Sequence, residues 1–172
     1  MTSDISKIIL DNAVKWSGPI GPLGHWPPET QMKELALSLG PDAAPQLAEL
    51  VLAMAAELDD SLGGLLDFAL IFAECHAKAT LAAFVPLLSA TSPTVVIHIL
   101  SATKDPDVLP PLRAAMESPQ ATEDTLVQAF DALTVLASQE AREILDSVDT
   151  TQLSKDALRE YRIALSVLSG ET

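Results

Sequence analysis

The feature that most limits how this chain can fold is a run of twenty-five residues, 79–103, that contains no Asp, Glu, Lys or Arg. A chain in water keeps such a run only if other segments cover most of it. Pro86 interrupts the first half and the sequence SATSPT at 89–94 breaks the middle, so the run cannot form the single apolar helix of about 20 residues that crosses a bilayer. It predicts two short helices, 81–88 and 95–100, joined by a tight turn and buried among neighbouring helices.

Composition and helix signals favour an all-α fold in a single domain over residues 1–172. Hydrophobic residues make up 48% of the chain but aromatic residues only 4%, so the core must consist mainly of Leu, Ala, Val and Ile. No segment shows the alternation of a strand. The single cysteine, Cys75, excludes an internal disulfide, and the N-terminus does not resemble a secretory signal, so we expect a cytoplasmic protein.

The second half of the chain repeats at a fixed interval. A shift of 32 residues, which we call the repeat shift, places Leu133 on Leu165. It also aligns the segments 132–138 (ALTVLAS) and 164–170 (ALSVLSG), which are near copies. The segment 96–102 (VIHILSA) shows the same pattern at a slightly longer spacing. A short helix, a turn and a longer helix that recur at intervals of about 30 to 40 residues are typical of helical solenoids.

In this pattern the chain resembles the HEAT and armadillo class of helical repeats, most clearly over residues 79–170 and loosely over 29–78. The resemblance implies a right-handed, HEAT-like helical solenoid of about nine to eleven helices. The signatures of HEAT repeats are present only in part: Arg113, for example, has Leu145 as its counterpart under the repeat shift. The alternative is an irregular helical bundle whose apolar helices align by chance.

Acidic residues are concentrated in one part of the chain. The formal charge is −14, and no Lys or Arg occurs between Lys33 and Lys78, where eight carboxylates lie. Residues 60, 67 and 74 are seven apart, so on one helix they share a face. We therefore predict an acidic ridge that binds a partner through Glu49, Glu57, Asp59, Asp60, Asp67 and Glu74. The alternative is an ordinary solvated helix surface.

This charge limits the kinds of partner. Direct nucleic-acid binding and binding to an anionic membrane both need cations, so we expect neither. A basic protein partner fits, because complementary charge speeds encounter and sets specificity. Small, acidic, helical proteins of this kind resemble bacterial immunity proteins and antitoxins. That resemblance, of size, charge and class, implies a non-catalytic inhibitor that covers the active site of a basic toxin or enzyme.

A second candidate site is the Pro- and Gly-rich loop 17–28 with the aromatic residues around it. The loop holds three glycines and four prolines, and long irregular loops in compact domains are often functional. Trp16, His25 and Trp26 are the residues of interest, since tryptophan is enriched at binding hot spots. Alternatively, both tryptophans anchor the N-terminal helix to the rest of the fold.

The residues that usually carry chemistry form no recognisable pattern. No histidine has the spacing of a zinc site, and neighbouring Cys75 and His76 would point about 100° apart on a helix. We expect no catalytic residues, metal or cofactor, a buried Cys75 and a core histidine at His98. One alternative is an enzyme or small-ligand protein with a pocket near loop 17–28, where His25 or His98 meets a carboxylate. Another is a scaffold whose apolar central helices form a homodimer.

Overall fold

The computed structural model describes residues 2–17, 29–57, 63–89 and 93–170, and these contain ten α-helices and no strand. The all-α prediction is therefore confirmed. The helices are α1 (Thr2–Trp16), α2 (Glu29–Leu39), α3 (Ala44–Glu57), α4 (Gly63–Cys75), α5 (Ala77–Phe84), α6 (Pro93–Ala102), α7 (Leu109–Met116), α8 (Glu123–Leu136), α9 (Gln139–Asp146) and α10 (Lys155–Ser169). Short 3-10 turns lie at Pro41–Ala43, Val85–Ser89, Pro106–Val108 and Thr150–Gln152.

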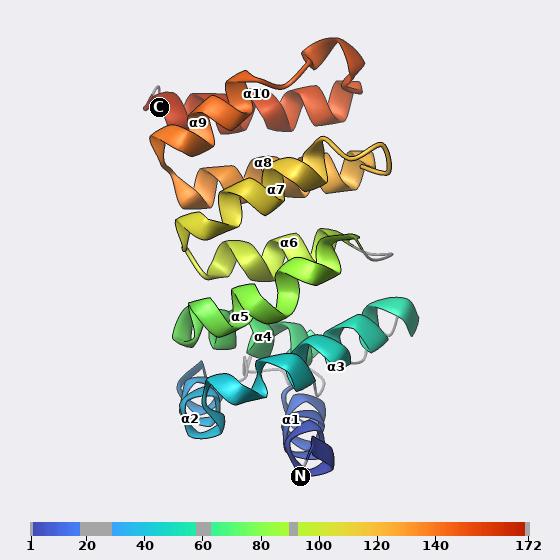
Figure 1. Cartoon of the computed structure of the whole chain (residues 1–172), viewed down its shortest axis with the longest axis vertical. Coiled ribbons are helices and arrows are strands. Elements are labelled where there is room, and N and C mark those ends of the chain that lie inside the picture. The colour runs from blue at the N-terminus through green and yellow to red at the C-terminus, as the bar shows by residue number, and fades with distance from the viewer. Residues whose placement is uncertain (1, 18–28, 58–62, 90–92, 171–172) are drawn as a thin grey trace, which may run out of the picture.

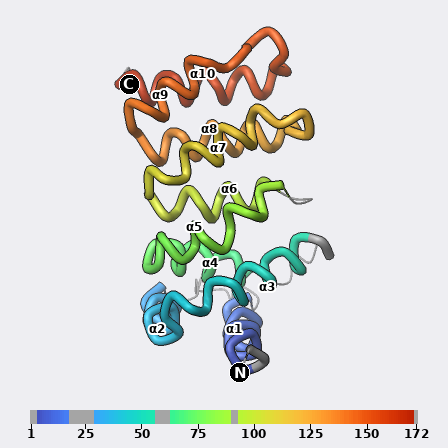
Figure 2. The backbone as a smooth tube through the Cα atoms, viewed as in Figure 1, coloured from blue at the N-terminus to red at the C-terminus, as the bar shows by residue number. Residues whose placement is uncertain are grey.

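The helices stack into a column whose two ends carry the two termini of the chain (Figure 1). Helices α3, α5, α7 and α9 form a front layer, nearer the viewer, and α4, α6, α8 and α10 form a rear layer (Figure 2). In the rear layer α6 packs between α4 and α8, and α8 packs between α6 and α10. The pairs α5–α6, α7–α8 and α9–α10 follow one another along the column. The right-handed, HEAT-like solenoid stays a prediction.

Local signals in the sequence explain where the repeated helices begin and end. Thr122, Ser138 and Ser154 are the N-cap residues of α8, α9 and α10, and each side chain accepts a hydrogen bond from the backbone N–H at the third position after it. Ala137 and Gly170 end α8 and α10 in the left-handed conformation. Because caps and left-handed ends define where a helix starts and stops, these residues set the starts of α8, α9 and α10 and the ends of α8 and α10.

The central uncharged run forms two helices as predicted, but the first has different bounds. The predicted helix 81–88 is wrong: α5 ends at Phe84, and Val85–Ser89 is a 3-10 turn with no fully buried residue. Pro86 explains the change, because its ring and missing N–H do not allow an α-helix to continue. Helix α6 is the buried one, with Val96, Ile97, Ile99 and Leu100 at most 3% exposed. A homodimer would therefore have to use other surfaces than these side chains.

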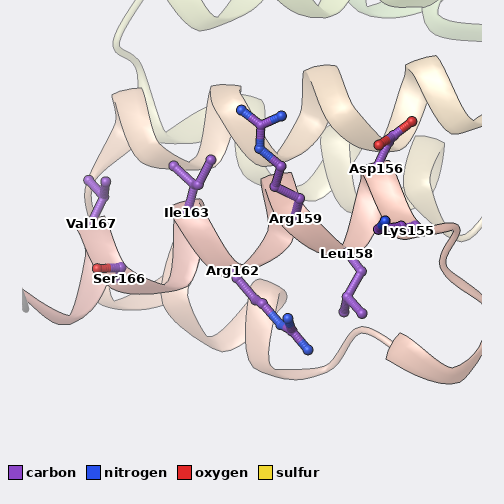
Figure 3. Close-up of a pocket in the computed structure, with 8 residues that line it drawn as sticks. All are labelled: Lys155, Asp156, Leu158, Arg159, Arg162, Ile163, Ser166 and Val167. Carbon is purple, nitrogen blue, oxygen red and sulfur yellow. The ribbon is translucent and has the colours of Figure 1, made fainter.

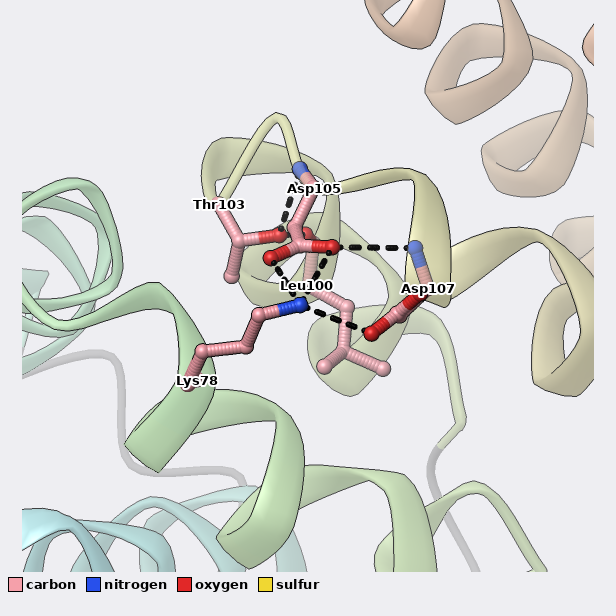
Figure 4. Close-up of polar contacts among 5 residues, drawn as sticks. All are labelled: Lys78, Leu100, Thr103, Asp105 and Asp107. Carbon is pink, nitrogen blue, oxygen red and sulfur yellow. Dashed lines mark hydrogen bonds and ion pairs between the residues drawn. The ribbon is translucent and has the colours of Figure 1, made fainter.

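An ion-pair cluster joins consecutive helices of the front layer (Figure 4). Lys78 of α5 lies with its Nζ 2.9 Å from Asp105 Oδ2 and 2.7 Å from Asp107 Oδ2, just before α7. Asp105 Oδ1 also accepts a hydrogen bond of 3.0 Å from the Asp107 backbone N–H, which caps the 3-10 turn ahead of α7. Thr103 Oγ1 accepts a hydrogen bond from the Asp105 backbone N–H and donates one to the Leu100 carbonyl.

Lys78→Met should make the chain less stable at neutral pH, with a difference from wild type that disappears in acid. The Lys78 ammonium, and after it the Asp107 backbone N–H, hold the pKa of the Asp105 carboxyl below its usual value. A lowered folded-state pKa adds stability that is complete above the ordinary Asp pKa and is lost as the pH falls through the lowered value. Urea midpoints of both proteins across this pH range measure the difference.

Lys155→Met is the matched control for this experiment. Lys155 is exposed, and in the part of the chain that the structure describes no ion pair involves it. In dilute protein, where chains are separate, its loss should leave the urea midpoint nearly unchanged at every pH, as is usual for a surface residue without an ion pair. A difference for Lys78→Met that persisted below the carboxyl range would show that the ion pair does not cause it.

Candidate interaction surface

The predicted acidic ridge is only partly within the described residues. Asp59, Asp60 and the side chain of Glu57 lie outside them. Glu49 is exposed on α3, and Asp67 and Glu74 lie on α4. Asp67 and Glu74 share a face of α4, as their spacing of seven predicts.

Glu49 belongs to a different layer from the other two carboxylates. It lies on the side of α3 opposite the buried Leu47, Ala48 and Val51, in the front layer. Asp67 and Glu74 lie on the side of α4 that turns away from its own buried residues, in the rear layer. The described carboxylates of the predicted ridge are thus divided between the two layers, and only the α4 pair remains together.

The two carboxylates of α4 have different surroundings. Glu74 Oε1 lies 3.6 Å from Lys104 Nζ, which follows α6, so this ion pair connects α4 with the end of its neighbour. Asp67 is partly buried and makes no ion pair within the described residues, and desolvation raises the pKa of its carboxyl. A partly desolvated carboxylate without a cation gains more from a partner's cation than a fully solvated one does.

Contacts between helices show that the α4 face continues along the rear layer. Gln128 Nε2 of α8 and His98 Nδ1 of α6 are 3.4 Å apart, so these two half-buried side chains meet on the outer side of the layer. A groove of about 450 Å³ between α8 and α10 is lined by Gln128, Asp131, Glu160 and Ile163 among others. The outer surfaces of α4, α6, α8 and α10 therefore form one continuous surface.

We call this surface the rear face and define it by its carboxylates and apolar side chains. Its carboxylates are Asp67, Glu74, Asp124, Asp131, Asp156 and Glu160. Its apolar members include Val135, Ile163 and Val167, which are 42%, 46% and 48% exposed. Lys104 at one margin pairs with Glu74, and on α10 Arg159 Nε lies 3.7 Å from Glu160 Oε1. Lys155, Arg159 and Arg162 line a groove at the α10 edge of this face together with Asp156, Ile163 and Val167. The rear face is thus acidic with exposed apolar side chains, a composition that suits binding of a basic protein surface.

Sequence reasoning missed the carboxylates of α8 and α10. Asp124 and Asp131 are seven apart on α8, the same spacing that drew attention to Asp67 and Glu74. The repeat shift also places Asp124 on Asp156. Combining the spacing of seven with the repeat would have pointed to the rear face, but the nearby cations of the C-terminal third concealed it.

The loop candidates are divided in the same way between described and undescribed residues. His25 and Trp26 lie outside the described residues. Trp16, at the end of α1, packs its ring on Phe68 of α4, with 5.6 Å between ring centroids. Trp16 is therefore an anchor of the N-terminal helix within the described fold.

The remaining residues that could take part in chemistry make contacts within the fold instead. Cys75 is only half-buried, not buried as predicted. His76 Nε2 lies 3.0 Å from the Ala36 carbonyl oxygen, and its ring packs on Phe72. His98 is also half-buried and contacts Gln128 rather than a carboxylate. Across the described ranges, no three or more His, Cys, Asp and Glu side chains are placed to hold a metal ion.

Whether a helix can span a bilayer depends on its length and its hydropathy. Within the ranges that the structure describes, every helix is too short or too polar to span a bilayer.

Comparison of the chain with protein-family models, with curated proteins and with solved structures finds no match. The similarity to HEAT and armadillo repeats, and that to immunity proteins and antitoxins, therefore stay resemblances of sequence pattern, size and charge.

Proposed function

We propose that this protein is a non-catalytic binding protein whose rear face docks a basic protein partner. The observation that carries the proposal is the rear face itself: six carboxylates and three exposed apolar side chains on one side of a layer of packed helices. Apolar side chains supply binding energy when water leaves them, and the surrounding charges select the partner and speed encounter. A stack of mutually packed helices holds both kinds of group in fixed positions before binding.

We further propose that binding inhibits the partner, as the resemblance to immunity proteins and antitoxins implies. In this proposal the rear face covers the active site of a basic toxin or enzyme, and inhibition is steric and electrostatic. The protein supplies no catalytic group or cofactor and acts in the cytoplasm. A partner that regains activity when salt dissociates the complex is the result that distinguishes an inhibitor from an adaptor.

Reversing three charges on the rear face should weaken binding steeply. The variant combines Asp67→Lys, Asp124→Lys and Asp131→Lys, which places cations against a basic surface. We expect the association rate constant to fall by at least about tenfold, because like charges oppose both encounter and docking. The measurement is a pull-down from the cells that produce the protein, at low and high salt, followed by association kinetics of the captured partner.

A matched variant reverses three carboxylates of the front layer, Glu49→Lys, Glu140→Lys and Glu143→Lys. All three are exposed, and the change in net charge is the same as on the rear face. A partner lost from the rear-face variant, kept by the front-layer variant and eluted by salt supports the proposal. A partner that both variants keep, or that only the front-layer variant loses, contradicts it.

A further inference from the structure

Large apolar side chains remain exposed mainly at the two ends of the column. Six of them are at least 39% exposed among the described residues: Ile8, Val14, Leu37, Val135, Ile163 and Val167. All but Val135 belong to the terminal helices α1, α2 and α10. A stack of helical repeats normally ends in polar faces, because no further repeat covers its last helix. Both ends of this column therefore keep apolar surface where a cap would be polar.

The C-terminal end is basic as well as apolar. The outer side of α10 carries an open groove of about 730 Å³, shown in Figure 3. Three cations, Lys155, Arg159 and Arg162, line it together with the single carboxylate Asp156, which gives the groove a net charge of +2. Ile163 lies beside them. A basic surface is unusual on a chain with a formal charge of −14.

The repeat shows that this basic surface replaces an apolar one. Phe130 of α8 is 1% exposed and contacts Tyr161 of α10, with ring centroids 5.7 Å apart. The repeat shift places Phe130 on Arg162 and Val127 on Arg159. The side of α8 that α10 covers thus corresponds to the outer side of α10. The arginines on the outer side of α10 are complementary in charge to a covering surface that supplies carboxylates.

The N-terminal end offers carboxylates and apolar side chains together. Helices α1 and α2 both pack against α4, and Figure 1 shows them at the opposite end of the column from α10. Val14 is 61% exposed and Leu37 is 58% exposed. Each lies about 140° around its helix from a buried residue, Ile9 or Met32, so both turn away from the column. The exposed carboxylates of α1 and α2 are Asp4, Asp11, Glu29 and Glu34, against the three lysines Lys7, Lys15 and Lys33.

We propose that the N-terminal end of a second copy of this chain covers the outer side of α10. The two ends have opposite net charge, and both expose apolar side chains. The contact joins two different surfaces, so it is heterologous, and each added copy leaves a free end of each kind. Copies therefore add head to tail and extend the column. This assembly covers Asp156, Ile163 and Val167, which the rear face shares with the α10 groove, and leaves the front face and the rear-face carboxylates of α4 and α8 free. It does not depend on the proposed function.

The test begins with the wild-type chain in sedimentation velocity and light scattering, from about 1 µM to about 1 mM. We expect the average mass to rise with concentration beyond that of a dimer. Two variants each disable one end. Arg159→Glu with Arg162→Glu alters the C-terminal end, and Val14→Ser with Leu37→Ser alters the N-terminal end. Each variant alone should raise the dissociation constant by at least about tenfold.

The decisive experiment mixes the two variants. Each variant keeps one intact end, so the mixture should form a one-to-one complex of two chains and grow no further. An isologous dimer does not predict this restriction, because its two copies contribute the same surface. Circular dichroism and thermal unfolding show whether the variants are folded. Should the serine variant unfold, Val14→Lys replaces it, since Val14 is the most exposed of these apolar side chains.

The proposal is overturned if the wild-type chain stays monomeric over the whole range, or if the mixed variants fail to associate. Association that neither variant weakens also overturns it. The rear-face variant Asp67→Lys, Asp124→Lys, Asp131→Lys keeps both ends intact and should assemble as the wild type does. Loss of partner binding with assembly retained, or the reverse, therefore shows which of the two proposals fails.

Discussion

Replacing Phe72 with alanine is expected to lower the free energy of unfolding by about 3–5 kcal/mol, the range for a phenylalanine removed from a packed core. Phe72 is fully buried on α4. Its ring lies between those of Phe68, at a centroid distance of 6.1 Å, and His76, at 4.8 Å. Trp16 continues this row beyond Phe68. The alanine leaves a cavity at the centre of the row and removes ring contacts on both sides.

Thermal unfolding and urea unfolding measure this loss, and the expected fall in Tm is roughly 6–20 °C for a domain of this size. Leu37→Ala is the control, because Leu37 is 58% exposed and its truncation should change stability by no more than about 0.5 kcal/mol. Both are measured at low concentration, where chains are separate. A Phe72→Ala variant as stable as Leu37→Ala would mean that the aromatic row is not the core of the N-terminal half.

Short-range features of the fold could be predicted from the sequence. The caps at Thr122, Ser138 and Ser154 and the glycine that ends α10 depend on a few neighbouring residues, so local sequence signals are enough to place them. The division of the central run into two helices follows from residues 89–94 in the same way. Pro86 shows the limit of this approach: the sequence pattern places it within a helix, whereas the chain changes to a 3-10 turn there.

Long-range features could not be predicted, because spacing along one helix does not say which layer that helix joins. The spacing of seven correctly places Asp67 and Glu74 on one face of α4, but it does not tell that Glu49 lies in the other layer. The contact between His76 Nε2 and the Ala36 carbonyl joins two segments far apart in the chain, and no local pattern announces it. The rear face becomes visible only once α4, α6, α8 and α10 are seen as neighbours.

The pair Gly63 and Gly64 also shows that local sequence does not reveal contacts between distant segments. Two consecutive glycines make a weak start for a helix, since glycine lowers helix stability. The structure begins α4 at Gly63 and brings α1 directly onto Gly64. The Gly64 backbone N–H donates a hydrogen bond of 2.9 Å to Ser17 Oγ, which in turn donates one of 2.8 Å to the Ala13 carbonyl. The second glycine is therefore required by the close approach of two helices.

Gly64→Ala should lower the free energy of unfolding by about 1–3 kcal/mol, as expected for overpacking. A Cβ at this position would lie 2.7 Å from the Ala13 carbonyl oxygen, 2.9 Å from Trp16 Cβ and 3.0 Å from Ser17 Oγ. The first two atoms belong to the backbone or lie next to it, so they can give way only if α1 moves. Urea unfolding measures the change, and a weaker packing of Trp16 should appear as a shift in its fluorescence.

Gly63→Ala makes the same chemical change at the preceding position, where a Cβ would meet nothing within 4 Å. Alanine there should leave stability unchanged or raise it by up to about 1 kcal/mol, because it favours the helix. The same helix preference works in favour of Gly64→Ala, so the difference between the two variants isolates the cost of the α1–α4 contact. Equal stability of the two variants would show that α1 does not pack on Gly64. The close α1–α4 contact would then not be what holds the aromatic row from Trp16 to His76 in place.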